Sequence, residues 1–303
     1  MSVPHALAAG PAALVLWGGL LGIGTAWGLT QFFMKIAMTS GLHPVGAALW
    51  QAVAGALVAT AVLLATGRRL PLSWRHCAFF AACGLLGTAL PASLSFTAIQ
   101  HLPVGIQALT LSTVPLMTLA LALPIGLDRP EPRRLAGLGL GALGVALIVG
   151  PEASLPEPGQ AAWVVLPMIV ALSYASENIV IARFRPEDAD AFVTGCGLLW
   201  AATVMLAPIV ALGGLDATPD DLGAPFAALV AAVLLNIVAY VGFVWLNGEG
   251  GAVFASQVGY VVTATGVVSG LVFLGERHAW TVWLAMALLF AGIALVRPRR
   301  RAR

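Results

Sequence analysis

The sequence predicts an all-α membrane protein of ten transmembrane helices, arranged as two inverted five-helix repeats with the N- and C-termini cytoplasmic. Its composition is the first observation: 60% of the 303 residues are hydrophobic and 9% are charged, with a mean hydropathy of +0.95. Soluble domains carry about 25% charged residues, and disordered chains are poor in apolar residues, so both classes are excluded. The other two observations are the lengths of the apolar segments and the placement of the basic residues.

Ten apolar segments have the length of a membrane-spanning helix, which needs about 20 mainly apolar residues. Charged residues, prolines and glycines separate them, as at Gly67-Arg68-Arg69. The expected spans are residues 14–35, 44–66, 76–99, 104–127, 134–150, 162–182, 191–212, 225–247, 251–274 and 279–296. The first run has no basic region before it and is too long for a signal-peptide core, so we expect it to remain as a helix.

Most of the 15 Lys and Arg residues fall on one side of the membrane when the ten spans are threaded through it. That side holds both termini and the loops after the second, fourth, sixth and eighth spans. Its basic residues are Arg68, Arg69, Arg75, Arg129, Arg133, Arg134, Arg183, Arg185, Arg297, Arg299, Arg300, Arg301 and Arg303. Only Lys35 and Arg277 fall on the other side. Because basic loops stay in the cytoplasm, both termini are predicted to be cytoplasmic.

The two halves of the chain match each other at a shift of 148 residues without a gap. Lys35 then falls on Arg183, and Asp128-Arg129 falls on Glu276-Arg277. Each half has an odd number of spans, so the second must be inserted upside down. The predicted domains are a first repeat at 14–150, an external linker at 151–161, a second repeat at 162–297 and a basic cytoplasmic tail at 298–303. Inverted repeats are typical of secondary transporters, whose central site lies between the repeats.

Several short motifs accompany this repeat. They are Trp27-Gly28 in the first span, Gly251-Ala252 and Gly275-Glu276-Arg277 at the two ends of the ninth, Gly137 to Gly144 in the fifth, and Ala291-Gly292 in the tenth. With these motifs the chain resembles the EamA-type ten-helix proteins of the drug/metabolite transporter superfamily, over about residues 14–297. The first copy has Leu127-Asp128-Arg129 where that family usually has Gly-Glu-Arg, and the acid is retained. The resemblance implies a cavity lined by helices of both repeats.

Glu177 is the one ionisable residue well inside a span, and a carboxylate is costly there unless it faces a cavity or a partner. Ser173 and Tyr174 share its helix face, with Asn178 beside it. One interpretation is a carboxylate that binds a substrate amine or a proton. The other is a neutral glutamic acid hydrogen-bonded to a neighbouring span, or a carboxylate paired with Arg183.

Polar stripes also mark the first, fourth, eighth and ninth spans. Each residue alone is explained by hydrogen bonding between helices, but together the stripes predict a wet central cavity. The candidate substrate-binding residues are Trp27, Gln31, Gln107, Tyr174, Glu177, Asn178, Asn236, Tyr240, Gln257 and Tyr260. One carboxylate among amides and phenols favours a zwitterion or weak cation, such as an amino acid, over a bulky anion. Pro91 and Pro115 lie inside spans and are expected to kink them.

The leading hypothesis is a secondary transporter of the inner (plasma) membrane that exports small polar metabolites by alternating access. A membrane-embedded enzyme, a channel and a structural membrane protein are the alternatives. The sequence has no HExxH, GxSxG or P-loop motif, and its histidines stand at termini or span ends, so no catalytic activity is expected. No cofactor or metal site is expected either, because Cys77, Cys83 and Cys196 form no CxxC pair.

The expected partners are a small-molecule substrate and the lipid bilayer. The arginine-rich tail is interpreted as a topology signal or a contact with anionic lipid, and not as a nucleic-acid site. The Gly- and Ala-rich faces of the fifth and tenth spans suit tight helix packing or a dimer contact, so the protein is expected to be a monomer or a homodimer.

Overall fold

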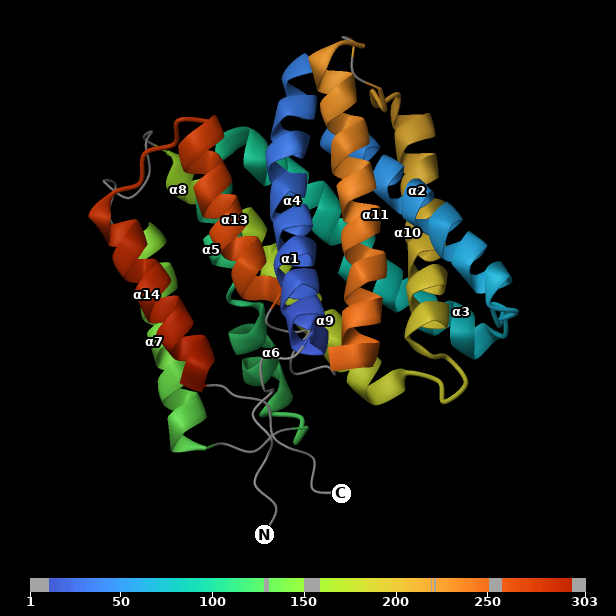
Figure 1. Cartoon of the computed structure of the whole chain (residues 1–303), viewed down its shortest axis with the longest axis horizontal. Helices are drawn as coiled ribbons and strands as arrows, with labels where there is room; N and C mark the ends of the chain where they lie inside the picture. The colour runs from blue at the N-terminus through green and yellow to red at the C-terminus, as the bar shows by residue number, and fades with distance from the viewer. Residues whose placement is uncertain are drawn as a thin grey trace.

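The computed structural model describes residues 11–127, 131–149, 159–218, 220, 222–250 and 258–295. Within these residues all regular structure is helical and there is no strand (Figure 1), which confirms the predicted all-α class. The first half contains α1 (Pro11–Ala37), η1 (Met38–Ser40), α2 (Pro44–Ala65), α3 (Trp74–Gly84), η2 (Leu85–Ala89), α4 (Leu90–His101), α5 (Val104–Leu111), α6 (Val114–Ala122) and α7 (Pro132–Val149). The second half contains α8 (Gln160–Trp163), α9 (Val165–Phe184), α10 (Ala191–Gly213), α11 (Ala224–Gly250), α13 (Val258–Phe273) and α14 (Trp280–Leu295).

Six helical stretches in the described residues are long and apolar enough to cross a bilayer. They are Pro44–Ala65, Trp74–His101, Val104–Ala122, Gln160–Phe184, Phe192–Gly213 and Ala224–Phe243. Leu135–Leu147, Val258–Phe273 and Trp280–Gly292 are shorter apolar helices. Residues 251–257, the start of the expected ninth span, lie outside the described residues, as do the tail and most of the linker.

Two of the expected spans are interrupted at prolines. The third span is built from α3, the π-helix η2 and α4, with Pro91 in the first turn of α4. The fourth breaks between α5 and α6, where Pro115 stands in the first turn of α6. It also ends at Ala122, earlier than the expected residue 127, and Gly126 turns the chain with a φ of +69°. Proline has no N–H to continue the helical ladder, which explains both interruptions.

Side-chain caps fix the starts of α2 and α10. His43 precedes Pro44, and its Nδ1 accepts a hydrogen bond of 3.2 Å from the Val45 N–H. Asp190 precedes α10, and its carboxylate accepts bonds of 2.9 Å from the N–H groups of Phe192 and Val193. Both caps satisfy backbone donors that have no partner within the helix.

The helices pack in a pattern that is symmetric between the two halves. α1 packs against α11 and α13, and α9, its counterpart in the second half, packs against α4 and α6. α2 packs on α10, α5 on α13, and α7 on α14, so these three pairs join corresponding helices of the two halves. In Figure 1, α1 lies between α11 and α13, α7 and α14 run together at one edge, and α2 and α10 lie toward the other.

Loops from the two halves meet at each end of the bundle. At one end the His43 N–H donates to the Asp216 carbonyl oxygen at 3.0 Å, and Lys35 pairs with Glu276 at 3.6 Å. These contacts join the loop after α1 to the loop after α10, and the end of α1 to the loop after α13. Every segment involved is one that the predicted topology places outside.

A second set of contacts joins loops that the predicted topology places in the cytoplasm. Arg68 pairs with Asp190 at 3.2 Å, and His76 Nε2 lies 3.0 Å from an Asp188 carboxylate oxygen. The hydrogen bond with His76 holds the pKa of the exposed Asp188 carboxyl below its usual range. Both pairs connect the α2–α3 region to the loop between α9 and α10.

Glycines allow the closest helix contacts. A Cβ on Gly28 of α1 would lie 2.9 Å from the Val262 carbonyl oxygen of α13. A Cβ on Gly292 of α14 would lie 2.7 Å from the Gly137 carbonyl oxygen of α7. Any larger residue would push these backbones apart. The glycines of the expected fifth and tenth spans are thus used in tight packing within one chain.

Candidate functional site

Glu177 lies on the face of α9 that packs against the π-helix η2. A Cβ on Gly87 of η2 would overlap the Glu177 carboxylate, so the glycine leaves room for the acid. One turn earlier, Ser173 Oγ donates a hydrogen bond of 2.7 Å to the Leu86 carbonyl oxygen. The acid predicted from the sequence therefore stands against an irregular segment of the third span.

The π-helix follows from the sequence around it. In a regular α-helix, Pro91 would have to donate to the carbonyl four residues earlier, that of Gly87, and it has no N–H. The chain instead widens, and the Leu90 N–H bonds to the Leu85 carbonyl oxygen, five residues back. Such single π-turns are frequent at functional sites. This turn presents backbone, with no side chain at Gly87, to the Glu177 carboxylate.

Two tyrosines and a thiol lie in the same region as the acid. Tyr174 on α9, Tyr240 on α11 and Cys83 on α3 all lie within electrostatic range of Glu177. The Tyr240 hydroxyl lies where a Cβ on Gly195 of α10 would be, so a second glycine makes room in the same region. We call Glu177, Tyr174, Tyr240, Gly87 and Gly195 the Glu177 site.

The Glu177 site carries one acid and no basic partner among the described residues. The sequence left open an ion pair with Arg183, and the structure does not form it. A carboxylate beside two phenols is suited to a ligand with a positive charge and hydrogen-bond donors, because each of these groups offers acceptor oxygens. The same acid is also suited to binding a proton.

Trp27 and Asn236 form a direct bridge between α1 and α11. The Trp27 indole N–H donates a hydrogen bond of 3.1 Å to Asn236 Oδ1. The indole also lies 5.2 Å, ring centre to ring centre, from Phe243. Asn236 therefore forms a hydrogen bond between two helices, which is the structural role that the sequence left open as the alternative to lining a cavity.

Gln31 and Gln107 meet in a separate network between α1, α4 and α5. The side-chain amide of Gln107 donates to Gln31 Oε1 at 3.1 Å and to Ser95 Oγ at 2.8 Å. Gln107 is 0% exposed, and its carbonyl oxygen Oε1 has no hydrogen-bond partner among the described residues. A buried acceptor without a donor is costly, so this atom is a place where a bound donor would add stability.

The remaining candidates are not brought to the Glu177 site. Asn178 is exposed, and its amide donates to Thr118 Oγ1 at 3.2 Å. Tyr260 is 38% exposed and meets Phe290 edge to face, with ring centres 5.7 Å apart. Gln257 lies outside the described residues.

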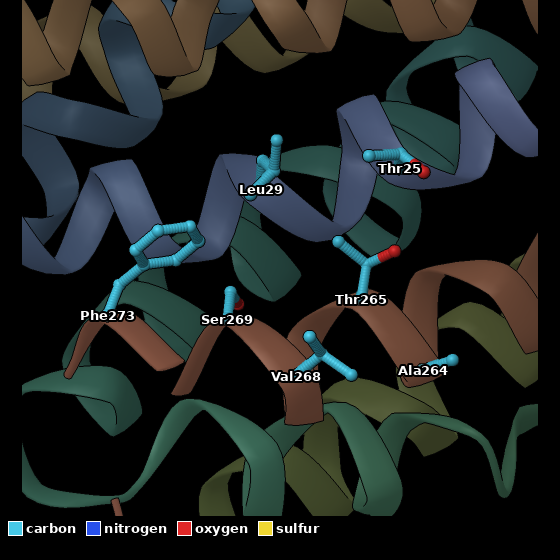
Figure 2. Close-up of a pocket in the computed structure, with 7 residues that line it drawn as sticks. All are labelled: Thr25, Leu29, Ala264, Thr265, Val268, Ser269 and Phe273. Carbon is cyan, nitrogen blue, oxygen red and sulfur yellow. The ribbon is translucent and has the colours of Figure 1, made fainter. Parts of the chain in front are cut away.

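A groove of about 370 Å³ runs between α1 and α13 (Figure 2). It is open and mainly apolar. It is lined by Thr25, Leu29, Ala264, Thr265, Val268, Ser269 and Phe273. None of the nine candidate residues that the structure describes lines it. The sequence did not single out this groove, because its lining residues are ordinary for a membrane helix.

Sequence reasoning missed Gly87 and Gly195, which make room for the acid and for one tyrosine. Glycine is common throughout the chain, with 34 in all, so neither position stands out. The one available signal was Pro91, which predicts a kink and marks Gly87 as the carbonyl that loses its donor.

One family model matches most of the chain, and the similar proteins found by sequence are named as transporters. The sequence profile of the EamA-like transporter family matches residues 15–150 and again residues 161–297. The uncharacterized inner membrane transporter YedA of Escherichia coli K12 is 28% identical over 93% of this chain and 90% of its own length. A probable amino-acid metabolite efflux pump of Salmonella typhimurium LT2 is 25% identical over 91% of this chain and 94% of its own.

A probable terminal-alkyne amino-acid exporter of Streptantibioticus cattleyicolor is 27% identical over 76% of each chain. One solved crystal structure superposes with a TM-score of 0.60 over 94% of this chain and 96% of the other, at 18% identity. At that identity the superposition supports the fold alone.

Proposed function

The chain belongs to the EamA-like transporter family, and from this premise we propose that it is a secondary transporter that exports small amine-bearing metabolites, such as amino acids. It is a multi-pass protein of the inner membrane, like its relatives. We propose that transport occurs by alternating access at the Glu177 site, between the repeats at 14–150 and 162–297. No catalytic activity, cofactor or nucleic-acid partner is part of the proposal. The protein would act as a monomer or a homodimer.

The topology we propose has ten spans, an inverted second repeat and cytoplasmic termini. The symmetric packing supports the repeat, since α1 and α9 occupy equivalent positions relative to the other half. The loop contacts support the grouping of the loops into two sets, because Lys35 meets Glu276 at one end of the bundle and Arg68 meets Asp190 at the other. Two nearly equivalent halves allow two nearly equivalent conformations, one open to each side.

The observation that carries the substrate class is the Glu177 carboxylate, which has no basic partner among the described residues and packs against the side-chain-free position Gly87. A substrate ammonium group supplies the missing charge, and Tyr174 and Tyr240 offer further oxygens. Two of the relatives are named for amino-acid compounds, which also carry an ammonium group. The proposal therefore favours zwitterions and weak cations over anions.

Counterflow in proteoliposomes against a panel of amino acids, amines and organic acids tests this function. We expect at least one amino acid or amine to exchange, and Glu177→Gln to reduce that exchange strongly. Glu187→Gln is the matched control, because Glu187 is exposed and lies in the loop between α9 and α10. Exchange of organic acids alone, or equal exchange by wild type and Glu177→Gln, would contradict the proposed substrate class.

The same variant separates the two roles of Glu177. If the acid carries only a proton, Glu177→Gln loses transport driven by a pH gradient and retains exchange of one substrate for another, which contradicts pairing between Glu177 and a substrate amine. If the acid pairs with the substrate amine, the variant loses substrate binding itself. If Glu177→Gln transports like wild type from pH 5.5 to 8, Glu177 has neither role and is a structural residue.

A further inference from the structure

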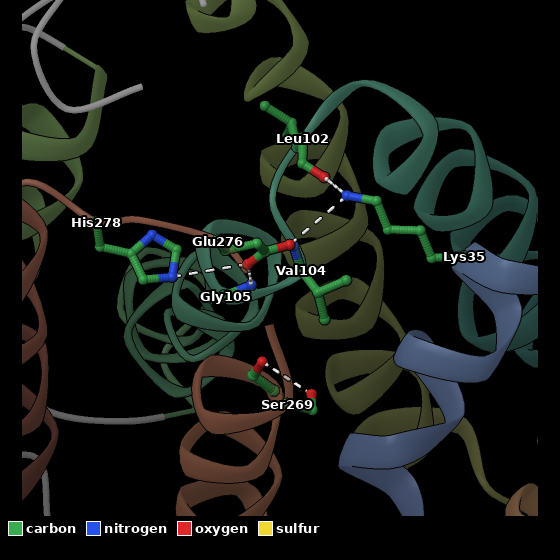
Figure 3. Close-up of polar contacts among 8 residues, drawn as sticks. Lys35, Leu102, Val104, Gly105, Ser269, Glu276 and His278 are labelled. Carbon is green, nitrogen blue, oxygen red and sulfur yellow. Dashed lines mark hydrogen bonds and ion pairs between the residues drawn. The ribbon is translucent and has the colours of Figure 1, made fainter. Parts of the chain in front are cut away.

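A buried charge cluster joins both halves of the chain at the end of the bundle that the proposed topology places outside (Figure 3). Its centre is Glu276, in the loop between α13 and α14. The Glu276 carboxylate accepts hydrogen bonds from the N–H groups of Val104 and Gly105, at 2.6 and 3.2 Å. These are the first donors of α5, where a carboxylate is favoured by the helix dipole.

Lys35, in the last turn of α1, connects a third segment to the cluster. Its Nζ lies 3.6 Å from Glu276 Oε1 and donates a hydrogen bond of 2.9 Å to the Leu102 carbonyl oxygen. The Glu276 side chain is 8% exposed and that of Lys35 is 28% exposed. The outer ends of α1, α4, α5 and α13 are thus held together through one carboxylate.

His278 completes the cluster and is not used by the proposed transport site. Its side chain is 1% exposed, and Nε2 lies 3.6 Å from Glu276 Oε2, too far for a hydrogen bond. Neither ring nitrogen has a hydrogen-bond partner among the described residues. A Cβ on Gly105 would lie 2.7 Å from Nε2, so this glycine admits the imidazole beside the helix start.

The charges in this cluster balance only while His278 is neutral. Lys35 from α1 contributes one positive charge and Glu276 one negative charge, and the start of α5 adds partial positive charge. Burial lowers the pKa of His278 from its ordinary value, although the Glu276 carboxylate acts in the opposite direction. Two other titratable residues are near in the chain or at the same end of the bundle: Arg277 is exposed, and His101 at the end of α4 stacks on Trp163, with ring centres 3.6 Å apart.

We propose that Lys35, Glu276 and His278 form a proton-binding latch, which holds the outer side closed while His278 is neutral and opens when His278 takes a proton from the outside. The proposal rests on the proposed function for its sidedness and for the role of opening. The proton passes from water to an imidazole nitrogen, and no covalent bond between heavy atoms changes. The imidazolium then competes with Lys35 for Glu276 and adds a charge that nothing in the cluster balances, so the closed arrangement weakens. Loss of the proton restores it.

Distances between spin labels at Thr39, after α1, and Trp280, at the start of α14, measure the latch directly. Both residues are exposed, and the labels require a background in which Cys77, Cys83 and Cys196 are replaced by Ala. The full chain is measured in detergent without substrate between pH 7.5 and 5.5. We expect a lower pH to increase the population with the longer distance. Each unit by which the pKa of His278 differs between the closed and the open state changes the ratio of these states about tenfold over the full titration.

Variants separate the latch from a general effect of acid. His278→Gln should lose the pH response and remain mainly closed, and Lys35→Met should be mainly open at both pH values. His101→Gln should retain the response, because that histidine stacks on Trp163 outside the cluster. A wild type without a pH response, or a His278→Gln protein that keeps it, would overturn the proposal. If His278→Gln is not monodisperse, His278→Asn gives the same test.

These distances are measured without substrate, so they do not depend on which compound is exported. If the protein exchanges no compound of the panel but shows the pH-dependent distance, the latch is supported and the proposed substrate class is wrong. If the protein exchanges amino acids but the distance does not change with pH, the substrate class is supported and the latch is wrong.

Discussion

Replacing Gly87 with alanine tests whether the room left in η2 serves the Glu177 carboxylate. The added Cβ would overlap the carboxylate, whose three end atoms are the nearest neighbours of that position. To reach an ordinary contact distance, the carboxylate must withdraw by about 1 Å or more. Its side chain is flexible, so we expect the acid to move and the helices to stay in place.

The expected loss is in substrate binding. A hydrogen bond to a charged group contributes about 1.5–3 kcal/mol, so displacing the carboxylate should weaken apparent affinity by roughly 10- to 100-fold. Thermal stability should hardly change, because alanine in a helix gains about 0.5–1 kcal/mol over glycine and offsets the displaced side chain. The assay is the substrate concentration dependence of counterflow, with the melting temperature in detergent measured in parallel.

Two further variants separate displacement of the Glu177 carboxylate from a general effect of placing alanine in a helix. Gly22→Ala is the matched control, since a Cβ there meets no atom within 4 Å, and it should transport like wild type. Adding Glu177→Asp to Gly87→Ala shortens the acid by one methylene group, so the pair should transport better than the product of the two single effects. Wild-type affinity in Gly87→Ala, or a loss that tracks a falling melting temperature, would refute the reasoning.

Other expected outcomes concern stability and topology. Asn236→Leu removes the acceptor of an interhelical hydrogen bond of 3.1 Å, so it should lower the melting temperature while transport per folded protein is retained. An unchanged melting temperature with reduced transport would instead indicate that Asn236 binds substrate. Burial lowers the pKa of His278 in the folded protein, so the unfolded chain binds a proton at this residue more readily than the folded protein does. The free energy of unfolding should therefore be unaffected by His278 above about pH 6.5 and should fall as the pH decreases below that value. His278→Gln should flatten this decrease between pH 7.5 and 5.5. Cysteines at Thr218 and Gln160 should react with an impermeant thiol reagent from outside intact cells, and one at Ser73 should not; labelling at position 73 would overturn the orientation.

The helices could be predicted well because each depends on local properties. Apolar length and the polar breaks between segments placed most helices within a few residues, and Pro91 and Pro115 marked both interruptions. The π-turn at Gly87 could not be placed in advance, because the same proline also permits a simple kink. The early end of the fourth span at Ala122 was missed because residues 123–127 carry no charge, although Pro124 and Gly126 are both signals that end a helix.

The candidate site was predicted less completely, because its contacts join residues far apart in the chain. Helical spacing placed Tyr174 and Glu177 together on α9, but it contains no information about Tyr240 on α11. Likewise, Lys35 and Glu276 served in the sequence only as markers of topology and of the repeat. Their contact depends on how α1 packs beside α13, which one sequence does not specify.

The π-turn in the third span has a consequence for how its two halves face their neighbours. One extra residue in a turn rotates everything beyond it by about 100° relative to an uninterrupted helix. α3 can therefore direct one stripe of side chains at α10, while α4 directs a different stripe at α9. Deleting one residue from 85–89 would turn α4 back by that angle and carry Ser95 away from Gln107. The third span thus consists of two helical segments, joined by one π-turn, whose side-chain faces point in different directions around the helix axis.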